Sequence, residues 1–300
     1  MTAPQAERMS GVVGRVIGAA LLLLCAQTPD TVAQDLLPPG PGWTVAGPAT
    51  LVDPVSPMAA VVQPALLSNR ILTWWLAASR PFGIEGLKHV EAAAVTSMGS
   101  GAVGCIWRQI EGDGLRHIEA ELSCGLPLVI AVQPARARVS EHGVSGVEGD
   151  SGVWLGAGAG FQALSGSGVR RCGAALCHLS AVAVWGRQWK AAVAYRRGFG
   201  RNGDWIRPWI GGAIGKDGER FSVRAGGMRP QGGDFEPALA LACCTGRLRI
   251  DAGAWGVTTA PAIGLHLVVK DLCWSVEGRW VPGLGLHLLW SVCSPHLWRP

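Results

Sequence analysis

The chain has 300 residues, of which 16% are charged and 49% apolar, so its charged fraction lies below the ~25% of ordinary soluble domains. The net charge of +5 is unclustered, and without a basic stripe interleaved with aromatic residues the composition gives no support to nucleic-acid binding. After the first thirty positions no apolar run reaches the ~18 residues of a spanning helix, so any membrane crossing must be made by strands.

Residues 1–33 are predicted to be a signal peptide. Arg8 and Arg15 precede the apolar run Val16–Cys25, and Thr31-Val32-Ala33 supplies small residues before a cleavage point. This arrangement predicts export of the chain.

Residues 34–84 are predicted to form an N-terminal arm. The segment is rich in proline and apolar residues, has "LLPPGPG" and "LVDPVSP" as breakers, and shows little periodicity. It contains too many large apolar side chains to stay in water, since burying each contributes ~1.5–3 kcal/mol. We therefore expect the arm to fold into or across the mouth of the next domain, with Trp74 and Trp75 as part of a plug.

Residues 85–292 are predicted to form a barrel, with a tail at 293–300. Segments such as "VWLGAGAGFQA", "RFSVRAGGM" and "AIGLHLVVK" alternate apolar with small or polar residues, and glycine-rich turns separate them. We count about fourteen such segments, each near the ~9–11 residues that a tilted strand needs to cross a bilayer. The predicted fold is all-β: a transmembrane antiparallel up-and-down β-barrel of about 14 strands with an N-terminal arm.

An exported soluble all-β module for binding or adhesion is the alternative. A soluble sandwich needs a core face of large side chains that pack across a ~10 Å gap. Here the apolar faces are mostly alanine, valine and leucine, which suits contact with lipid. Many of the 14 tryptophans also lie near strand ends, where an interfacial girdle would place them.

The segment "LRHIEAELSC" places His117, Glu119 and Glu121 at every second position. In a strand these side chains share one face, while the residues between them form an apolar face. A barrel explains the pattern if the polar face lines the lumen. A metal site is the alternative, but it needs further ligands from neighbouring strands, so we predict solvated charges and no metal. The residues predicted to line the lumen are His117, Glu119, Glu121, Arg136, Arg138, Arg224, Arg249, Asp251 and His266.

Eight cysteines follow the signal peptide: Cys105, Cys124, Cys172, Cys177, Cys243, Cys244, Cys273 and Cys293. Their spacing is not that of zinc ligands. They are interpreted as small apolar residues of the strands in preference to a disulfide framework, although an even number in an exported chain leaves disulfides open.

Enzymatic chemistry has little support in the sequence. "EGDSGV", Glu148–Val153, is similar to the nucleophile loop of trypsin-like serine proteases, but no histidine motif precedes Ser151 and a polar hairpin turn accounts for the segment. No glycine-rich phosphate loop follows a strand and opens a helix. We predict neither an enzyme nor a cofactor.

Two stretches near the start of the mature chain resemble the FadL-like outer-membrane proteins of the PorV/PorQ type. Gln63-Pro64-Ala65 matches an Asn-Pro-Ala signature, with glutamine for asparagine, and Arg80-Pro81-Phe82-Gly83 matches the entry into the first strand. "RLRIDAGAWGVTTAPAIGLHLVV" resembles the family's closing hairpin. The resemblance implies a bacterial outer-membrane barrel, either a channel for small or amphipathic solutes or a component of a secretion or surface-attachment system. It also implies an arm that enters the barrel and limits flow. The implied partners are outer-membrane lipid and either hydrophobic small molecules or a secretion-system protein.

Overall fold

The computed structural model describes residues 43–52, 63–67, 73–98, 101–112, 114–128, 151–166, 169–185, 188–199, 208–218, 220–257, 259–270 and 272–294. Three short helical turns, α2 (Trp43–Ala46), η1 (Gly47–Val52) and η2 (Pro64–Leu67), precede the strands, and η3 (Pro81–Gly83) links the first two strands. The strands are β1 (Thr73–Arg80), β2 (Lys88–Met98), β3 (Gly101–Gly112), β4 (Leu115–Leu128), β5 (Ser151–Gly166), β6 (Val169–Trp185), β7 (Trp189–Phe199), β8 (Trp209–Asp217), β9 (Phe221–Pro230), β10 (Glu236–Thr245), β11 (Leu248–Trp255), β12 (Ala260–Val269), β13 (Leu272–Val281) and β14 (Gly285–Cys293).

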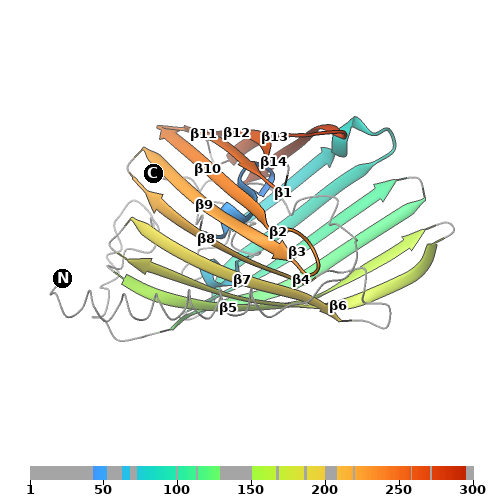
Figure 1. Ribbon diagram of the computed structural model, residues 1–300, viewed down its shortest axis with the longest axis horizontal. Helices are drawn as coiled ribbons and strands as arrows, with labels where there is room; N and C mark the ends of the chain where they lie inside the picture. The colour runs from blue at the N-terminus through green and yellow to red at the C-terminus, as the bar shows by residue number, and fades with distance from the viewer. Residues whose placement is uncertain are drawn as a thin grey trace.

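These fourteen strands form one closed barrel, which confirms the predicted fold (Figure 1). Each strand pairs antiparallel with the strands before and after it in the sequence. β1 pairs with β14 in the same antiparallel sense, from Trp75 opposite Cys293 to Arg80 opposite Leu288. Closure leaves no strand with an unpaired edge. Among the described residues, no helix is long and apolar enough to cross a membrane.

The two faces of the wall differ in chemistry because side chains alternate along each strand. In β4, Glu119 and Glu121 are buried on the inner face, while Leu122 and Leu126 are 67% and 55% exposed on the outer face. The same alternation in the other strands places leucine, valine, phenylalanine and tryptophan outside and most of the charged side chains inside. The outer surface is therefore apolar and the bore is polar.

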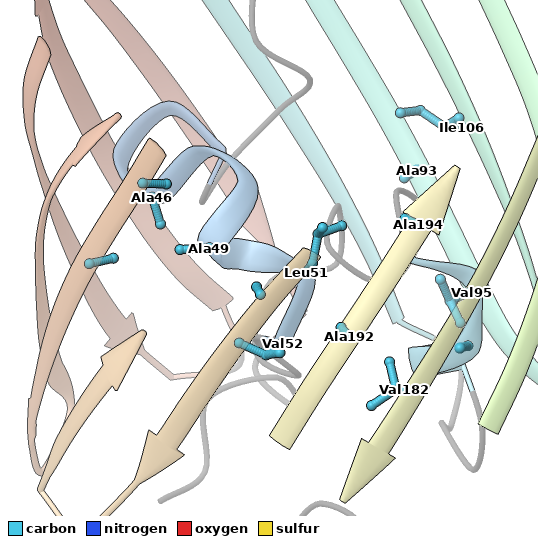
Figure 2. Close-up of a cluster of buried hydrophobic side chains, with 14 of the residues drawn as sticks. Ala46, Ala49, Leu51, Val52, Ala93, Val95, Ile106, Val182, Ala192 and Ala194 are labelled. Atoms are coloured by element: carbon cyan, nitrogen blue, oxygen red, sulfur yellow. The ribbon is translucent and has the colours of Figure 1, made fainter. Parts of the chain in front are cut away.

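The described turns that precede the strands, α2, η1 and η2, lie inside the barrel (Figure 1). α2 contacts β11, β12 and β13; η1 contacts β8, β9 and β10; η2 contacts β4, β5 and β6. Figure 2 shows the small apolar side chains of the first two turns gathered within the wall. Ala49 and Leu51 have no exposed surface, and Val52 is 2% exposed.

The predicted boundaries of the barrel need two corrections. The wall begins at Thr73, inside the segment assigned to the arm, and Cys293, assigned to the tail, is the last residue of β14. β1 escaped detection because both of its faces are largely apolar: Trp75 and Ala77 point inward and Trp74 and Leu76 outward. An alternation of polarity cannot mark a strand in which the central residues of both faces are apolar.

Only some of the tryptophans near strand ends lie on the outer surface, where an interfacial girdle would place them. Trp107, Trp189 and Trp274 are exposed on the outside, as an interfacial position requires. Trp154, Trp209 and Trp255 are buried instead. Position near a strand end does not decide which face a side chain occupies, because that depends on its register in the sheet.

Candidate functional site

A continuous line of polar side chains runs around half of the inner wall, and we call it the wall network. It consists of His287, Ser79, His89, Glu91, Arg108, Glu119, Gln162, Arg196, Glu121 and His178. Neighbouring members lie at hydrogen-bond or ion-pair distance, and together they come from β14 and from β1 to β7. The network therefore connects strands that are remote in the sequence.

Glu119 is the centre of the network. Its carboxylate accepts hydrogen bonds from Arg108 and Arg196, each at 2.6 Å, and from the Gln162 amide. Arg196 also reaches Glu121 at 3.2 Å. Glu119, its three partners and Glu121 are each at most 8% exposed, so their charges are shielded from solvent. Buried charges persist only when they are paired in this way.

The network continues from Glu91 to β14. The Glu91 carboxylate lies 4.0 Å from the Arg108 Nε atom and 2.8 Å from the His89 Nε2 atom. The other ring nitrogen of His89 is 3.1 Å from the Ser79 hydroxyl, which is 3.2 Å from His287 Nε2. Polar side chains thus follow one another along the wall across the β1–β14 seam.

A second polar cluster occupies the opposite side of the bore. The Arg249 Nε atom donates to both oxygens of Asp251, at 2.8 and 3.0 Å, and His266 Nε2 lies 2.8 Å from the same carboxylate. Arg224 on β9 donates to Ser222 at 2.9 Å. Both halves of the inner wall therefore carry ionisable groups of both signs.

The arm is attached to the wall by polar and by close apolar contacts. The Gln63 side chain, which has no exposed surface, donates to the main-chain carbonyls of Ala181 and Val193, at 2.9 and 3.3 Å. The Ala65 amide donates to the Ser180 hydroxyl at 3.1 Å. Gln63 is the glutamine of the Gln-Pro-Ala motif, so that motif is the anchor of the arm.

Glycines on the inner face make room for the arm. A Cβ atom on Gly156 would overlap the backbone of Pro64 and Ala65, and one on Gly253 would overlap the Val45 carbonyl. A Cβ on Gly215 would lie 2.9 Å from Val52. In "VWLGAGAGFQA" Gly156 makes room for the arm and Gly158 leaves space for the Glu121 carboxylate, while the alanines between the glycines point outward.

Most of the residues predicted to line the lumen face it. Glu119, Glu121, Arg224, Arg249, Asp251 and His266 are buried on the inner face, and His117 is half-buried near the end of β4. Arg136 and Arg138 lie outside the described residues. Trp75 points inward from β1 and Trp74 outward, so these two belong to the wall and not to the arm.

The predicted lumen residues have partners on neighbouring strands that the sequence does not mark as site residues. Arg108, Arg196 and His178 complete the wall network, yet each looks like an ordinary polar residue of an alternating strand. The sequence signal that could identify them is the two-residue alternation, because each of them occupies the polar face of its strand. The structure also places Ser151, considered as a nucleophile, at the first position of β5. Across the described residues, no group of three or more histidine, cysteine, aspartate or glutamate side chains is arranged to hold a metal ion.

The barrel has counterparts among solved structures, although no protein-family model and no curated protein sequence matches the chain. The toluene transporter TbuX of Ralstonia pickettii superposes with a TM-score of 0.57 at 10% identity, over 87% of this chain and 99% of that one. The outer-membrane protein Omp33 of Acinetobacter baumannii gives 0.49 at 8% identity, over 76% and 98%. The KdgM porin gives 0.41 at 11% identity, over 74% and 98%. The chain has the fold of the β-barrel proteins of bacterial outer membranes.

Proposed function

We propose that the protein is a FadL-like channel of the bacterial outer membrane that passes small or amphipathic solutes and whose bore is limited by its own N-terminal arm. The observation that carries the proposal is the arm seated within a closed barrel whose outside is apolar and whose inside is charged. A structural scaffold has no need of a charged bore. A channel does, because a solute that crosses it must replace its hydrogen bonds with water by hydrogen bonds with side chains of the wall.

The contacts of the arm support a plug that can be displaced. Among the described residues, its polar contacts with the wall include two hydrogen bonds from Gln63 and one from Ala65, and small apolar side chains such as Ala49 and Val52 are buried beside them. No covalent link between the arm and the wall is present among the described residues. Such contacts can be broken and re-formed without unfolding the closed sheet.

The class of solute follows from the two kinds of surface inside the barrel. Displacement of the arm would give a solute access both to the charged side chains of the wall network, such as Glu119 and Arg196, and to apolar side chains of the arm, such as Leu51, which are buried while the arm is in place. An amphipathic solute can contact both. The likeness to TbuX, named a toluene transporter, agrees with a solute that has apolar surface.

Deleting residues 34–65 tests the proposal. In planar lipid bilayers the intact protein is expected to give small or rare conductance steps, and the deletion is expected to give larger, stable ones because the bore is cleared. Unchanged heat-modifiable migration on gels serves as the control that the barrel still folds.

Two outcomes would argue against a channel. Equal conductance of the two proteins would show that the arm does not limit flow. Silence of both, together with co-purification of a stoichiometric partner, would instead favour a scaffold of a secretion or surface-attachment system.

A further inference from the structure

Two cysteines face each other across the β13–β14 pair, next to the β1–β14 seam at which the barrel closes. Cys273 of β13 and Cys293 of β14 are direct cross-strand partners. They are 0% and 3% exposed, both on the inner face, and the structure has both as thiols.

This register suits a disulfide. Directly opposed residues of an antiparallel pair have Cα atoms about 4.5 or 5.5 Å apart, depending on the hydrogen-bonding site. A disulfide needs Cα atoms at about 4.4–6.8 Å. Cys273 and Cys293 can therefore be bridged by side-chain rotation with little movement of either strand.

The other described cysteines do not have this geometry. Cys105 and Cys124 share the outer face of β3 and β4, but they are offset by two residues, which leaves diagonal neighbours about 7–8 Å apart. The remaining ones face residues of other kinds: Cys177 faces Ala159 and Arg197, Cys243 faces Ile250, and Cys244 faces Arg249. Among the described residues, one pair alone is directly opposed.

We propose that Cys273 and Cys293 form a disulfide in the mature protein. The proposal rests on the outer-membrane location argued above, because export exposes the thiols to an oxidising compartment. The oxidant is a disulfide-exchange protein. One cysteine thiolate attacks the disulfide of the oxidant and forms a mixed disulfide, and the second thiolate displaces the oxidant as a dithiol. Two protons leave the cysteines, and two electrons reduce the oxidant.

Burial sets the time at which the bond forms. In the closed barrel neither sulfur is accessible to a protein oxidant, so exchange takes place before β14 docks on β1. Cys293 also lies opposite Trp75, at the end of the β1–β14 ladder. The bond therefore holds the register of the last strand against β13 while the first strand closes the barrel.

Peptide mapping of the protein from outer membranes tests the proposal. The sample is acid-quenched, denatured so that buried thiols react, alkylated without reductant and digested. The expected result is a linked pair of peptides that contain Cys273 and Cys293, with Cys105 and Cys124 alkylated as internal controls. Alkylated Cys273 and Cys293 in the membrane-inserted protein would overturn the proposal.

Refolding in a glutathione redox buffer separates pairing from location. The wild type and Cys105→Ser are expected to form the disulfide between Cys273 and Cys293. Cys293→Ser is expected not to form it. Failure of the wild type to form it shows that the register argument is wrong. A bond that forms in vitro but is missing from the protein isolated from outer membranes overturns the proposal for the cell. Channel conductance is measured separately on the same samples, so that failure of the proposed channel function is distinguished from failure of the disulfide proposal.

Discussion

At the scale of single residues, the wall network is a set of buried charges whose stability depends on mutual pairing. Glu119 compensates two guanidinium groups, those of Arg108 and Arg196. Removing one partner of a buried ion pair costs about 3–5 kcal/mol, because the remaining charge is left without compensation. Such a loss far exceeds that of an exposed ion pair, which contributes at most about 1 kcal/mol.

Glu119→Gln is therefore expected to lower the free energy of unfolding by about 3–5 kcal/mol. Urea titration of the protein in lipid vesicles, followed by tryptophan fluorescence, measures the change. Glu111→Gln is the matched control, since Glu111 is exposed on β3 and accepts a hydrogen bond from the exposed side chain of Gln109, and its effect should stay within about 0.5 kcal/mol. Equal effects of the two substitutions would contradict a buried, mutually compensated network.

At the scale of elements, the arm and the wall are shaped for each other. The short turns of the arm carry small apolar residues. Where their backbone contacts the backbone of the wall, the wall has a glycine, as at Gly156 and Gly253. Close packing of this kind tolerates no added volume, because backbone atoms cannot rotate away as side chains do. The position of the arm is thus controlled by residues of the wall.

Gly253→Val is expected to expel α2 from its place beside β11, since the valine would occupy the position of the Val45 carbonyl. The expected result is a rise in single-channel conductance in the direction of the 34–65 deletion. Gly212→Val is the matched control, because a Cβ there meets nothing closer than 3.5 Å. A conductance unchanged in Gly253→Val, with the barrel folded, would show that the arm does not obstruct the bore.

At the scale of the whole molecule, the outer surface resembles that of a protein solvated by lipid. Along β12, Ile263, Leu265 and Leu267 are about half exposed while the residues between them turn inward. An exposed apolar band of this extent would promote aggregation in water, but in a bilayer it contacts hydrocarbon.

Leu265→Arg is expected to reduce insertion into lipid vesicles and to lower the free energy of unfolding there by about 2–4 kcal/mol, the cost of a cation near the bilayer midplane. Leu265→Val is the control and should behave nearly as the wild type. If the arginine variant folded equally well in buffer without lipid or detergent, the alternative of a soluble all-β module would be supported instead.

The sequence by itself determined the class of fold and the faces of its strands. Two-residue periodicity is a local property, so it showed that Glu119 and Glu121 share one face and Leu122 the other before any partner strand was known. The prediction of about fourteen strands is confirmed, although thirteen of them, β2 to β14, lie in the predicted barrel segment and β1 lies in the predicted arm, because the centre of its inner face, Trp75 and Ala77, is apolar.

Only the tertiary structure decided which residues meet. Register between strands sets the partners of Glu119 and brings Cys273 opposite Cys293, and neither pairing leaves a trace in the spacing along the chain. The place of the arm also depends on closure, because a bore exists only after β1 has paired with β14. Periodicity is encoded within each strand, whereas register and closure are long-range choices that depend on the packing of all fourteen strands together.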